Sequence, residues 1–255
     1  MIEFIHLVKK FGELVAVNDL TLTIPRGEFF AMLGPNAAGK TTTLKILAGL
    51  MKPTSGSARA DGFDVQTRPL EARRRMAFVP DFPFLYDKLT PWEFFRFTGQ
   101  LFQMDDTRIR SIGQELVRRF SLEPFVNLPI EGLSHGTRQR VAILSALLHD
   151  PAVFVIDEPM VGLDPHHARV VKDILKERSI AGMTVLVSTH QLSVAEEMAD
   201  RIGIVHQGRL IALGTPDELR RQSGTAGPLE DVFLALTAQE AGLPEEKAPV
   251  KPAPA

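Results

Sequence analysis

The sequence contains no cysteine, and this absence excludes several kinds of site at once. Disulfides, thiol nucleophiles, and zinc or iron–sulfur centres held by cysteine are impossible. A large excess of one charge sign is also absent, because the chain has 29 Lys and Arg and 31 Asp and Glu, for a formal net charge of −2. A local basic patch is compatible with this balance, but strong nucleic-acid binding through bulk charge is not. We therefore expect no nucleic-acid partner.

Long apolar runs are missing as well. A membrane-spanning helix needs about 18 consecutive apolar residues, and runs such as Phe29–Leu33 and Ala152–Ile156 are far shorter. The first residues, Met1–His6, lack the basic start and apolar core of a signal peptide. We expect a cytoplasmic protein, and any work at a membrane would require another chain to span the bilayer.

The 255 residues have the composition of a globular protein, and their length predicts one or two domains. Apolar residues alternate along the first 24 positions, which predicts strands. Continuous apolar stretches at 29–33, 153–156 and 184–187 indicate strands of a sheet that is covered on both faces. Two shorter strands are predicted after them, at 201–205 and 209–212.

The turn after the strand at 29–33 matches the phosphate-binding pattern G-x-x-x-x-G-K-[ST] in full. Its residues and the one that follows are Gly34, Pro35, Asn36, Ala37, Ala38, Gly39, Lys40, Thr41 and Thr42. Glycines let backbone N–H groups curl around phosphate oxygens, and the N-terminus of the next helix attracts the anion. We expect Lys40 to face the β- and γ-phosphates and the Thr41 hydroxyl to ligate Mg²⁺. Thr42 either contacts the α-phosphate or is simply an early helix residue.

Two acids, Asp157 and Glu158, end the apolar strand at 153–156. Ligands bind beyond the carboxyl ends of parallel strands, so these acids and the phosphate-binding turn are expected at one edge. Asp157 would then reach the Mg²⁺ held by Thr41. Glu158 would sit beside the γ-phosphate, where a carboxylate can orient and deprotonate the attacking water. Without the phosphate-binding turn, the same acids would be compatible with a solvated loop.

The segment Leu133–Arg140, with sequence LSHGTRQR, resembles the signature L-S-G-G-Q-x-Q-R of ATP-binding cassette (ABC) ATPases. The order of motifs also resembles that family, and the resemblance covers about residues 2–236. It implies an α/β fold: a P-loop NTPase core with a mixed sheet flanked by helices, an N-terminal antiparallel β-subdomain and an inserted α-helical subdomain. The core and β-subdomain would occupy about 1–85 and 134–236, and the helical subdomain about 86–133. The chain after the resemblance, residues 237–255, is expected to be a disordered tail, because the segment from about Pro244 to Ala255 is rich in Pro, Ala and charge.

The resemblance also implies roles for residues outside the two motifs above. Phe11 matches the aromatic residue that stacks on adenine, although a core Phe is the plain alternative. Ser134 and Gly136 match signature residues that bind the γ-phosphate of ATP held by the opposite subunit. Asp164 matches the aspartate that couples the two sites, with a helix N-cap as the alternative. His190 matches the histidine that hydrogen-bonds the γ-phosphate.

Four positions depart from the family pattern. Ala37 replaces a glycine of the phosphate-binding turn, which leaves the backbone less freedom. His135 and Thr137 replace a glycine and the glutamine of the signature. Asp81 stands where the family has a glutamine that can ligate Mg²⁺. Because aspartate is shorter and charged, Asp81 is either a further Mg²⁺ ligand or a turn residue.

The implied function is that of an ATP-binding and ATP-hydrolysing subunit of an ABC transporter. ATP and Mg²⁺ would be required, and the partners would be a second ATP-binding subunit, in a homo- or heterodimer, and an integral membrane permease. Such a subunit would lie at the cytoplasmic face of the membrane through its permease. The segments 214–219 and 229–236 resemble the subfamily that powers exporters of drugs, antibiotics, haem or polysaccharide, which favours export. The alternatives are a soluble ABC ATPase without a transport role and a regulatory subunit that hydrolyses ATP weakly.

Overall fold

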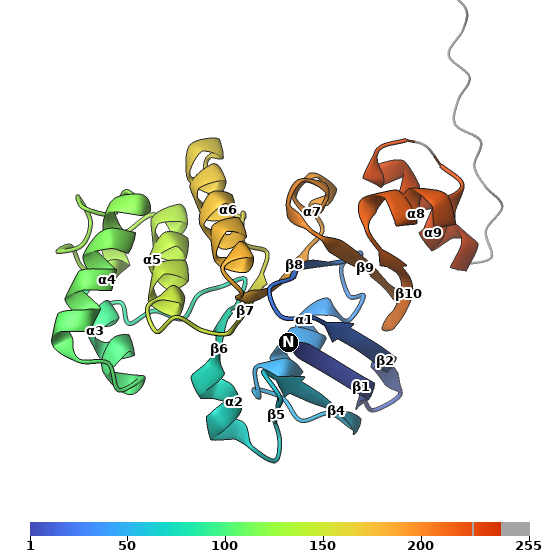
Figure 1. The fold of residues 1–255 in the computed structure, drawn as a ribbon, viewed down its shortest axis with the longest axis horizontal. Coiled ribbons are helices and arrows are strands. Elements are labelled where there is room, and N and C mark those ends of the chain that lie inside the picture. The colour runs from blue at the N-terminus through green and yellow to red at the C-terminus, as the bar shows by residue number, and fades with distance from the viewer. Residues whose placement is uncertain (226, 241–255) are drawn as a thin grey trace, which may run out of the picture.

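The computed structural model describes residues 1–225 and 227–240, which form two sheets with helices around them (Figure 1). The smaller sheet is antiparallel throughout and comes from the N-terminal part of the chain. Its strands, in spatial order, are β2 (Leu14–Ile24), β1 (Ile2–Phe11), β4 (Ser55–Ala60) and β5 (Phe63–Asp64). This sheet matches the antiparallel β-subdomain that the resemblance implies.

The larger sheet is mixed, because five of its strands are parallel and the sixth, at one edge, pairs antiparallel. Its spatial order is β10 (Arg209–Gly214), β9 (Arg201–His206), β3 (Phe29–Leu33), β8 (Thr184–Thr189), β7 (Val153–Asp157) and β6 (Met76–Val79). Strands β3, β7 and β8 are buried along their whole length, as their unbroken apolar sequences predict. The predicted α/β class with a mixed sheet is confirmed.

Alternate side chains of β3 enter different cores. Phe30 and Met32 pack toward β1, β2 and helix α1 (Lys40–Leu47), which lie on one side of the sheet in Figure 1. Phe29 enters the core on the opposite side, and Ala31 a third cluster near the C-terminal helices. Because successive side chains of a strand point to opposite faces, β3 packs against the elements on both faces of the sheet.

The stretch predicted to be helical contains α3 (Pro91–Leu101), α4 (Asp106–Arg119) and the short 3₁₀ helix η1 (Ile130–Gly132). Thr90 and Glu93 form a reciprocal capping box at the start of α3, and Asp105 caps α4. Helix α5 (His135–Leu147) packs against α3 and α4, which form the helical lobe, and also against β6, so it connects this lobe to the larger sheet (Figure 1).

The remaining helices are α2 (Pro69–Arg75), α6 (Pro165–Ile180), α7 (Leu192–Met198), α8 (Pro216–Ser223) and α9 (Leu229–Glu240). Helix α9 corrects the predicted start of the disordered tail, since residues 237–240 are helical. Leu229, Val232 and Leu236 are buried and hold α9 on the core, so the helix continues one turn past them. The rest of the predicted tail, 241–255, lies outside the described residues. In the described part of the chain, every helix is too short or too polar to cross a membrane.

His149, just after α5, stacks on Phe102 with ring centroids 3.6 Å apart and planes 9° apart. Burial lowers the pKa of His149 from 6.5 to about 4. Between those two values the unfolded chain binds the proton and the folded chain does not, so stability rises with pH across this window.

We expect acidification from pH 7 to pH 4 to cost up to about 3 kcal/mol of unfolding free energy through His149 alone. Replacing it with Phe keeps an aromatic ring on Phe102 and removes the titration. Denaturant unfolding of wild type and His149→Phe at several pH values measures the difference. The exposed His166→Gln variant is the control and should follow wild type; an equal acid sensitivity in His149→Phe would contradict the assignment.

Candidate functional site

An open cleft lies at the carboxyl end of the parallel strands, where β3 passes through residues 34–39 into α1. The cleft is lined by Phe11, Leu14, Ala16, residues 36–42, Asp81, Asp157 and Glu158. The phosphate-binding turn, both acids that follow β7 and Asp81 are therefore brought together. Phe11 is 46% exposed at this cleft rather than in the core, and Lys9 Nζ lies 4.9 Å from the centroid of its ring, which leaves part of the side chain available for stacking.

Close packing of the turn explains its two glycines. A Cβ on Gly34 would lie 2.3 Å from the carbonyl oxygen of Val205, and one on Gly39 would lie 2.2 Å from that of Ala16. Gly39 also has φ of +101°, outside the range that side chains tolerate. Ala37 has φ of +63°, a left-handed conformation that costs about 1–2 kcal/mol for a residue with a Cβ. The turn thus keeps at Ala37 the backbone shape for which glycine is the easier residue.

The Lys40 side chain folds back over this turn. Its Nζ donates hydrogen bonds to the carbonyl oxygens of Gly34 at 2.6 Å and Pro35 at 3.0 Å. Burial lowers the pKa of Lys40, against the opposing effect of the Glu158 and Asp157 charges. The ammonium group is consequently held at the mouth of the turn, with most of its water removed.

Thr41 and Asp157 meet across the cleft, because the Thr41 hydroxyl donates a hydrogen bond of 2.6 Å to Asp157 Oδ2. Asp81 lines the same cleft, and its pKa is raised by burial and then by the charges of Asp157 and Glu158. Three acids therefore crowd one edge of the sheet. A cation among them would relieve their mutual repulsion.

These groups fit Mg²⁺. The ion prefers oxygen ligands, and it commonly takes one or two carboxylates and fills its remaining positions with water and phosphate oxygens. Thr41 and Asp157 supply two oxygens at hydrogen-bond distance from each other. Within the described residues, no group of three His, Asp or Glu side chains could hold a metal ion alone. Such a site would depend on phosphate for part of its ligand set.

Glu158 is held by the end of the neighbouring strand. Its backbone is left-handed, with φ of +48°, at the sharp turn where β7 ends. Thr189 Oγ1 donates to Glu158 Oε2 at 3.0 Å, and the backbone N–H of His190 donates to Oε1 at 3.1 Å. His190 Nδ1 lies 2.7 Å from the same Oε1. The sequence-based prediction missed Thr189 as a partner of Glu158. The only sequence signal for this role is that Thr189 stands directly before His190 at the end of β8.

Ser134, Gly136 and Asp164 lie outside the cleft, around the start of α5 and α6. Ser134 caps α5, and a Cβ on Gly136 would lie 2.4 Å from the Gly162 carbonyl oxygen. The His135 ring packs on Gly162, so close that a Cβ there would meet it at 2.1 Å. The signature segment is therefore locked against the loop that follows Glu158.

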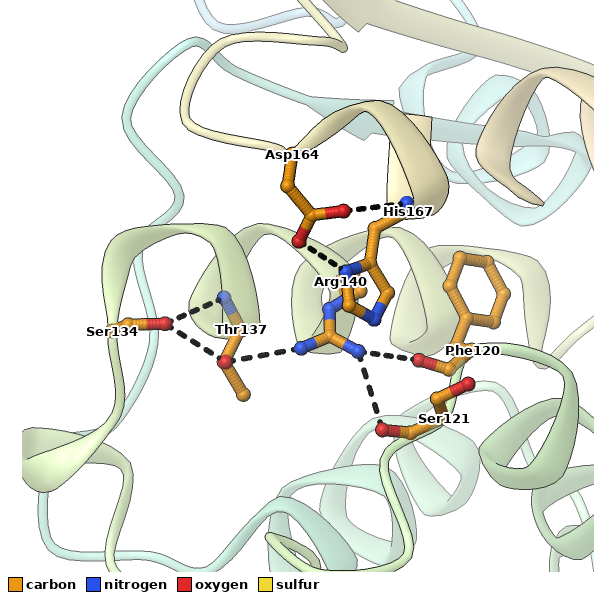
Figure 2. Close-up of polar contacts among 7 residues, drawn as sticks. All are labelled: Phe120, Ser121, Ser134, Thr137, Arg140, Asp164 and His167. Carbon is orange, nitrogen blue, oxygen red and sulfur yellow. Dashed lines mark hydrogen bonds and ion pairs between the residues drawn. The ribbon is translucent and has the colours of Figure 1, made fainter. Parts of the chain in front are cut away.

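Asp164 is the N-cap of α6, as its alternative role predicts. It accepts a hydrogen bond of 3.0 Å from the backbone N–H of His167, and its other oxygen lies 2.5 Å from His167 Nδ1 (Figure 2). These hydrogen bonds lower the pKa of Asp164 to about 2. The carboxylate is exposed and ionised, with its orientation set by α6.

Comparisons with known proteins agree with this arrangement. A family model described as ABC transporter matches residues 17–161. Nod factor export ATP-binding protein I of Burkholderia lata is 37% identical over 86% of this chain and 72% of its own length. The ABC transporter ATP-binding protein NatA of Bacillus subtilis is 34% identical over 86% of this chain and 89% of its own.

Solved structures give the same result. One described as the ATP-binding subunit of an ABC transporter has a TM-score of 0.89 and 34% identity, and covers 93% of this chain and 99% of that one. A dimeric post-hydrolysis state of the ATP-binding cassette MJ0796, bound to ADP and phosphate, has a TM-score of 0.77 and 30% identity, over 84% of this chain and 98% of that one. The family model spans more than half of the residues, and the relatives align over most of their length. The chain belongs to the ATP-binding subunits of the ABC transporter family and is an ATPase.

Proposed function

We propose that two copies of this ATPase, or one copy and a related subunit, bind ATP between them and hydrolyse it to drive a separate membrane permease. The observation that carries this proposal is the separation of Ser134 and Gly136 from the cleft that holds Lys40 and Glu158. The start of α5 offers a hydroxyl and free backbone N–H groups to an anion. A head-to-tail pair would bring that helix start to the γ-phosphate in the other copy's cleft, and the dimeric state of the MJ0796 relative supports such a pair.

Binding of ATP in the cleft begins with its phosphates. Backbone N–H groups of the turn and of the first turn of α1 would contact the phosphate oxygens. Lys40 would exchange the Gly34 and Pro35 carbonyls for the β- and γ-phosphates, since a carbonyl is a weaker partner for an ammonium than a phosphate is. Phe11, exposed at the cleft mouth, would stack on adenine, and Asn36, Ala38 and Thr42 would complete the contacts.

Hydrolysis requires an activated water in line with the leaving group. Mg²⁺, held by Thr41, Asp157 and in this proposal also Asp81, would neutralise charge on the phosphates. Glu158 would accept the proton of the attacking water, because its carboxylate is fixed by Thr189 and His190 beside the Thr41–Asp157 pair. His190 would then turn its imidazole to the γ-phosphate, while its backbone N–H keeps Glu158 in place.

The permease would dock on the loop 82–86, between β6 and α3. Phe82, Phe84 and Tyr86 are 73%, 91% and 58% exposed there, and the loop borders an apolar groove. Exposed aromatic side chains in one loop are typical of an interaction surface. We propose export as the direction, since relatives named for Nod factor export and linearmycin resistance match this chain. The working location would be the cytoplasmic face of the membrane.

Replacing Glu158 with Gln tests the proposed function directly. We expect the ATP hydrolysis rate to fall at least about 100-fold, because a general base contributes that much or more. ATP should then hold the variant as a dimer in light scattering. Wild type should consume its ATP and return to the oligomeric state that it has without nucleotide. Glu71→Gln, on α2 and outside the cleft, is the matched control. Hydrolysis at the wild-type rate in Glu158→Gln would show that Glu158 is not the base.

Replacing Asp81 with Asn tests the predicted metal role of Asp81. If its carboxylate ligates Mg²⁺, the Mg²⁺ concentration for half-maximal hydrolysis should rise about tenfold at saturating ATP, as for a lost metal contact. Asp87→Asn, a few residues along the same loop but outside the cleft, is the control. An unchanged Mg²⁺ titration in Asp81→Asn would leave Asp81 as a turn residue.

The backbone of the phosphate-binding turn gives a matched pair of variants. Gly39→Ala should lose ATP affinity at least about tenfold, since its Cβ would collide with the Ala16 carbonyl and its φ is forbidden. Ala37→Gly should bind ATP as well as wild type, with unfolding free energy within about 1 kcal/mol, because relief of strain offsets the added freedom of the unfolded chain. Equilibrium binding and denaturant unfolding measure both effects. Equal affinities in the two variants would contradict this account of the turn.

A further inference from the structure

The Ser134 hydroxyl is the outer end of a line of polar groups on one face of α5 (Figure 2). Its Oγ accepts a hydrogen bond of 3.3 Å from the backbone N–H of Thr137 and lies 2.9 Å from Thr137 Oγ1. Arg140 Nη2 in turn donates to Thr137 Oγ1 at 3.1 Å. The three residues follow each other at a spacing of three, which places them along one side of the helix.

The inner end of this line is anchored in the helical lobe. Arg140 Nη1 donates to the carbonyl oxygens of Phe120 at 2.6 Å and Ser121 at 3.2 Å, where α4 ends (Figure 2). A cation is favourable at a helix C-terminus. Arg140 and Thr137 are only 5% and 4% exposed, so water does not compete for these contacts. The guanidinium therefore has one fixed orientation toward Thr137.

The direction of the protons follows from what each group can do. A guanidinium only donates, so Thr137 Oγ1 must accept from Arg140. Thr137 still has one proton, and the bond to Ser134 can run either way. If Ser134 donates to Thr137, its single proton is used and only lone pairs face outward, which repel an anion. If Thr137 donates to Ser134, the Ser134 proton is free to point outward.

The second arrangement is also the one that a buried cation favours. Donation from Arg140 makes the Thr137 hydroxyl a better donor, since hydrogen bonds in a chain strengthen one another. Ser134 Oγ then accepts from both the hydroxyl and the backbone N–H of Thr137 and has only its outward proton left to give. The chain of donors runs from Arg140 through Thr137 to Ser134 and ends at whatever anion lies before α5.

We propose that Thr137 and Arg140 are positioning residues that orient the Ser134 proton toward the γ-phosphate bound in a second copy. This inference rests on the proposed function, because it takes Ser134 as the group that reaches the partner's nucleotide. It gives a role to Thr137, which stands where the signature has glutamine. The Thr137 hydroxyl accepts a hydrogen bond from Arg140 and donates one to Ser134 in this proposal. It also links the phosphate contact to the end of α4 in the helical lobe.

The test is ATP-dependent dimerisation in the Glu158→Gln background, with Ser134→Ala as the reference for a lost phosphate contact. Thr137→Val keeps the shape and the capping N–H but removes the hydroxyl. We expect its dimer dissociation constant to rise about tenfold, the effect of roughly one hydrogen bond. Thr137→Ser keeps the hydroxyl and should stay within about twofold of the parent. ATP affinity at concentrations where the chain is monomeric should not change in either variant, since Thr137 does not line the cleft.

Arg140→Lys, alone and combined with Thr137→Val, tests the inner step. Because Arg140 acts through the Thr137 hydroxyl, its effect on dimerisation should largely disappear in the Thr137→Val background. If the two substitutions have fully additive effects on the dimer dissociation constant, Arg140 has no part in orienting Ser134. Melting temperatures of the variants show whether a weaker dimer results from a loss of folding stability.

The outcomes distinguish this inference from the proposed function. If Ser134→Ala prevents dimerisation but Thr137→Val dimerises like the parent, the orienting role is wrong and the head-to-tail dimer stands. If Thr137→Ser is as weak as Thr137→Val, packing rather than the hydroxyl matters, and the inference is again wrong. If Glu158→Gln itself does not dimerise with ATP, the proposed function fails and this inference fails with it.

Discussion

The parallel pairing of β3, β8 and β7 is the constraint on which the rest of the site depends. Leu33 pairs with Thr189, and Asp157 pairs with Ser188, so the three strands end at one level. Each strand is buried on both faces along its length, so a slip by one residue would exchange the side chains that pack into the two different cores. Glu158 and His190 directly follow the ends of β7 and β8, and Lys40 follows β3 after the turn at 34–39, so the hydrophobic register brings the three residues to one edge of the sheet.

Hydrogen bonds between residues at the ends of different strands then complete the arrangement that the register begins. Asp157 accepts from Thr41, and Glu158 accepts from Thr189 and from the backbone of His190. Asp157 is thus held by the helix that follows β3, and Glu158 is held by the end of β8 and the residue after it. Because Thr189 is buried at the end of β8 and Thr41 lies in the first turn of α1, the carboxylates are placed before any nucleotide arrives, which is the form of preorganisation that electrostatic catalysis requires. The left-handed turn at Glu158 is tolerated for the same reason, since the surrounding strands determine its path.

Much of this arrangement could be predicted from sequence because it is encoded locally. The apolar runs of β3, β7 and β8 and the glycine spacing of the phosphate-binding turn are short-range patterns, and they indicated both the sheet and the cleft. The start of the tail was predicted too early because it was set where the family resemblance ends, at 236, whereas Leu236 holds α9 through contacts with distant elements and the helix continues to Glu240. The partners of Glu158 and the anchor of Arg140 were out of reach for the same reason. Thr189 is 31 residues from Glu158, and Phe120 is 20 from Arg140, and no local pattern pairs them.

The departures from the family pattern at Ala37, His135 and Thr137 are better understood through the local structure at each position than as losses. At Ala37 the turn keeps a left-handed backbone despite its Cβ. His135 fills the space over Gly162 and thereby ties the signature segment to the loop after Glu158. Thr137 places a hydroxyl between Ser134 and a buried cation. In the proposed function, each replacement would preserve what the neighbouring phosphate-binding group needs, namely a backbone shape, a fixed loop or a directed proton. A dimer built from such chains would then join one copy's acids to the other copy's hydroxyl through groups that are already oriented.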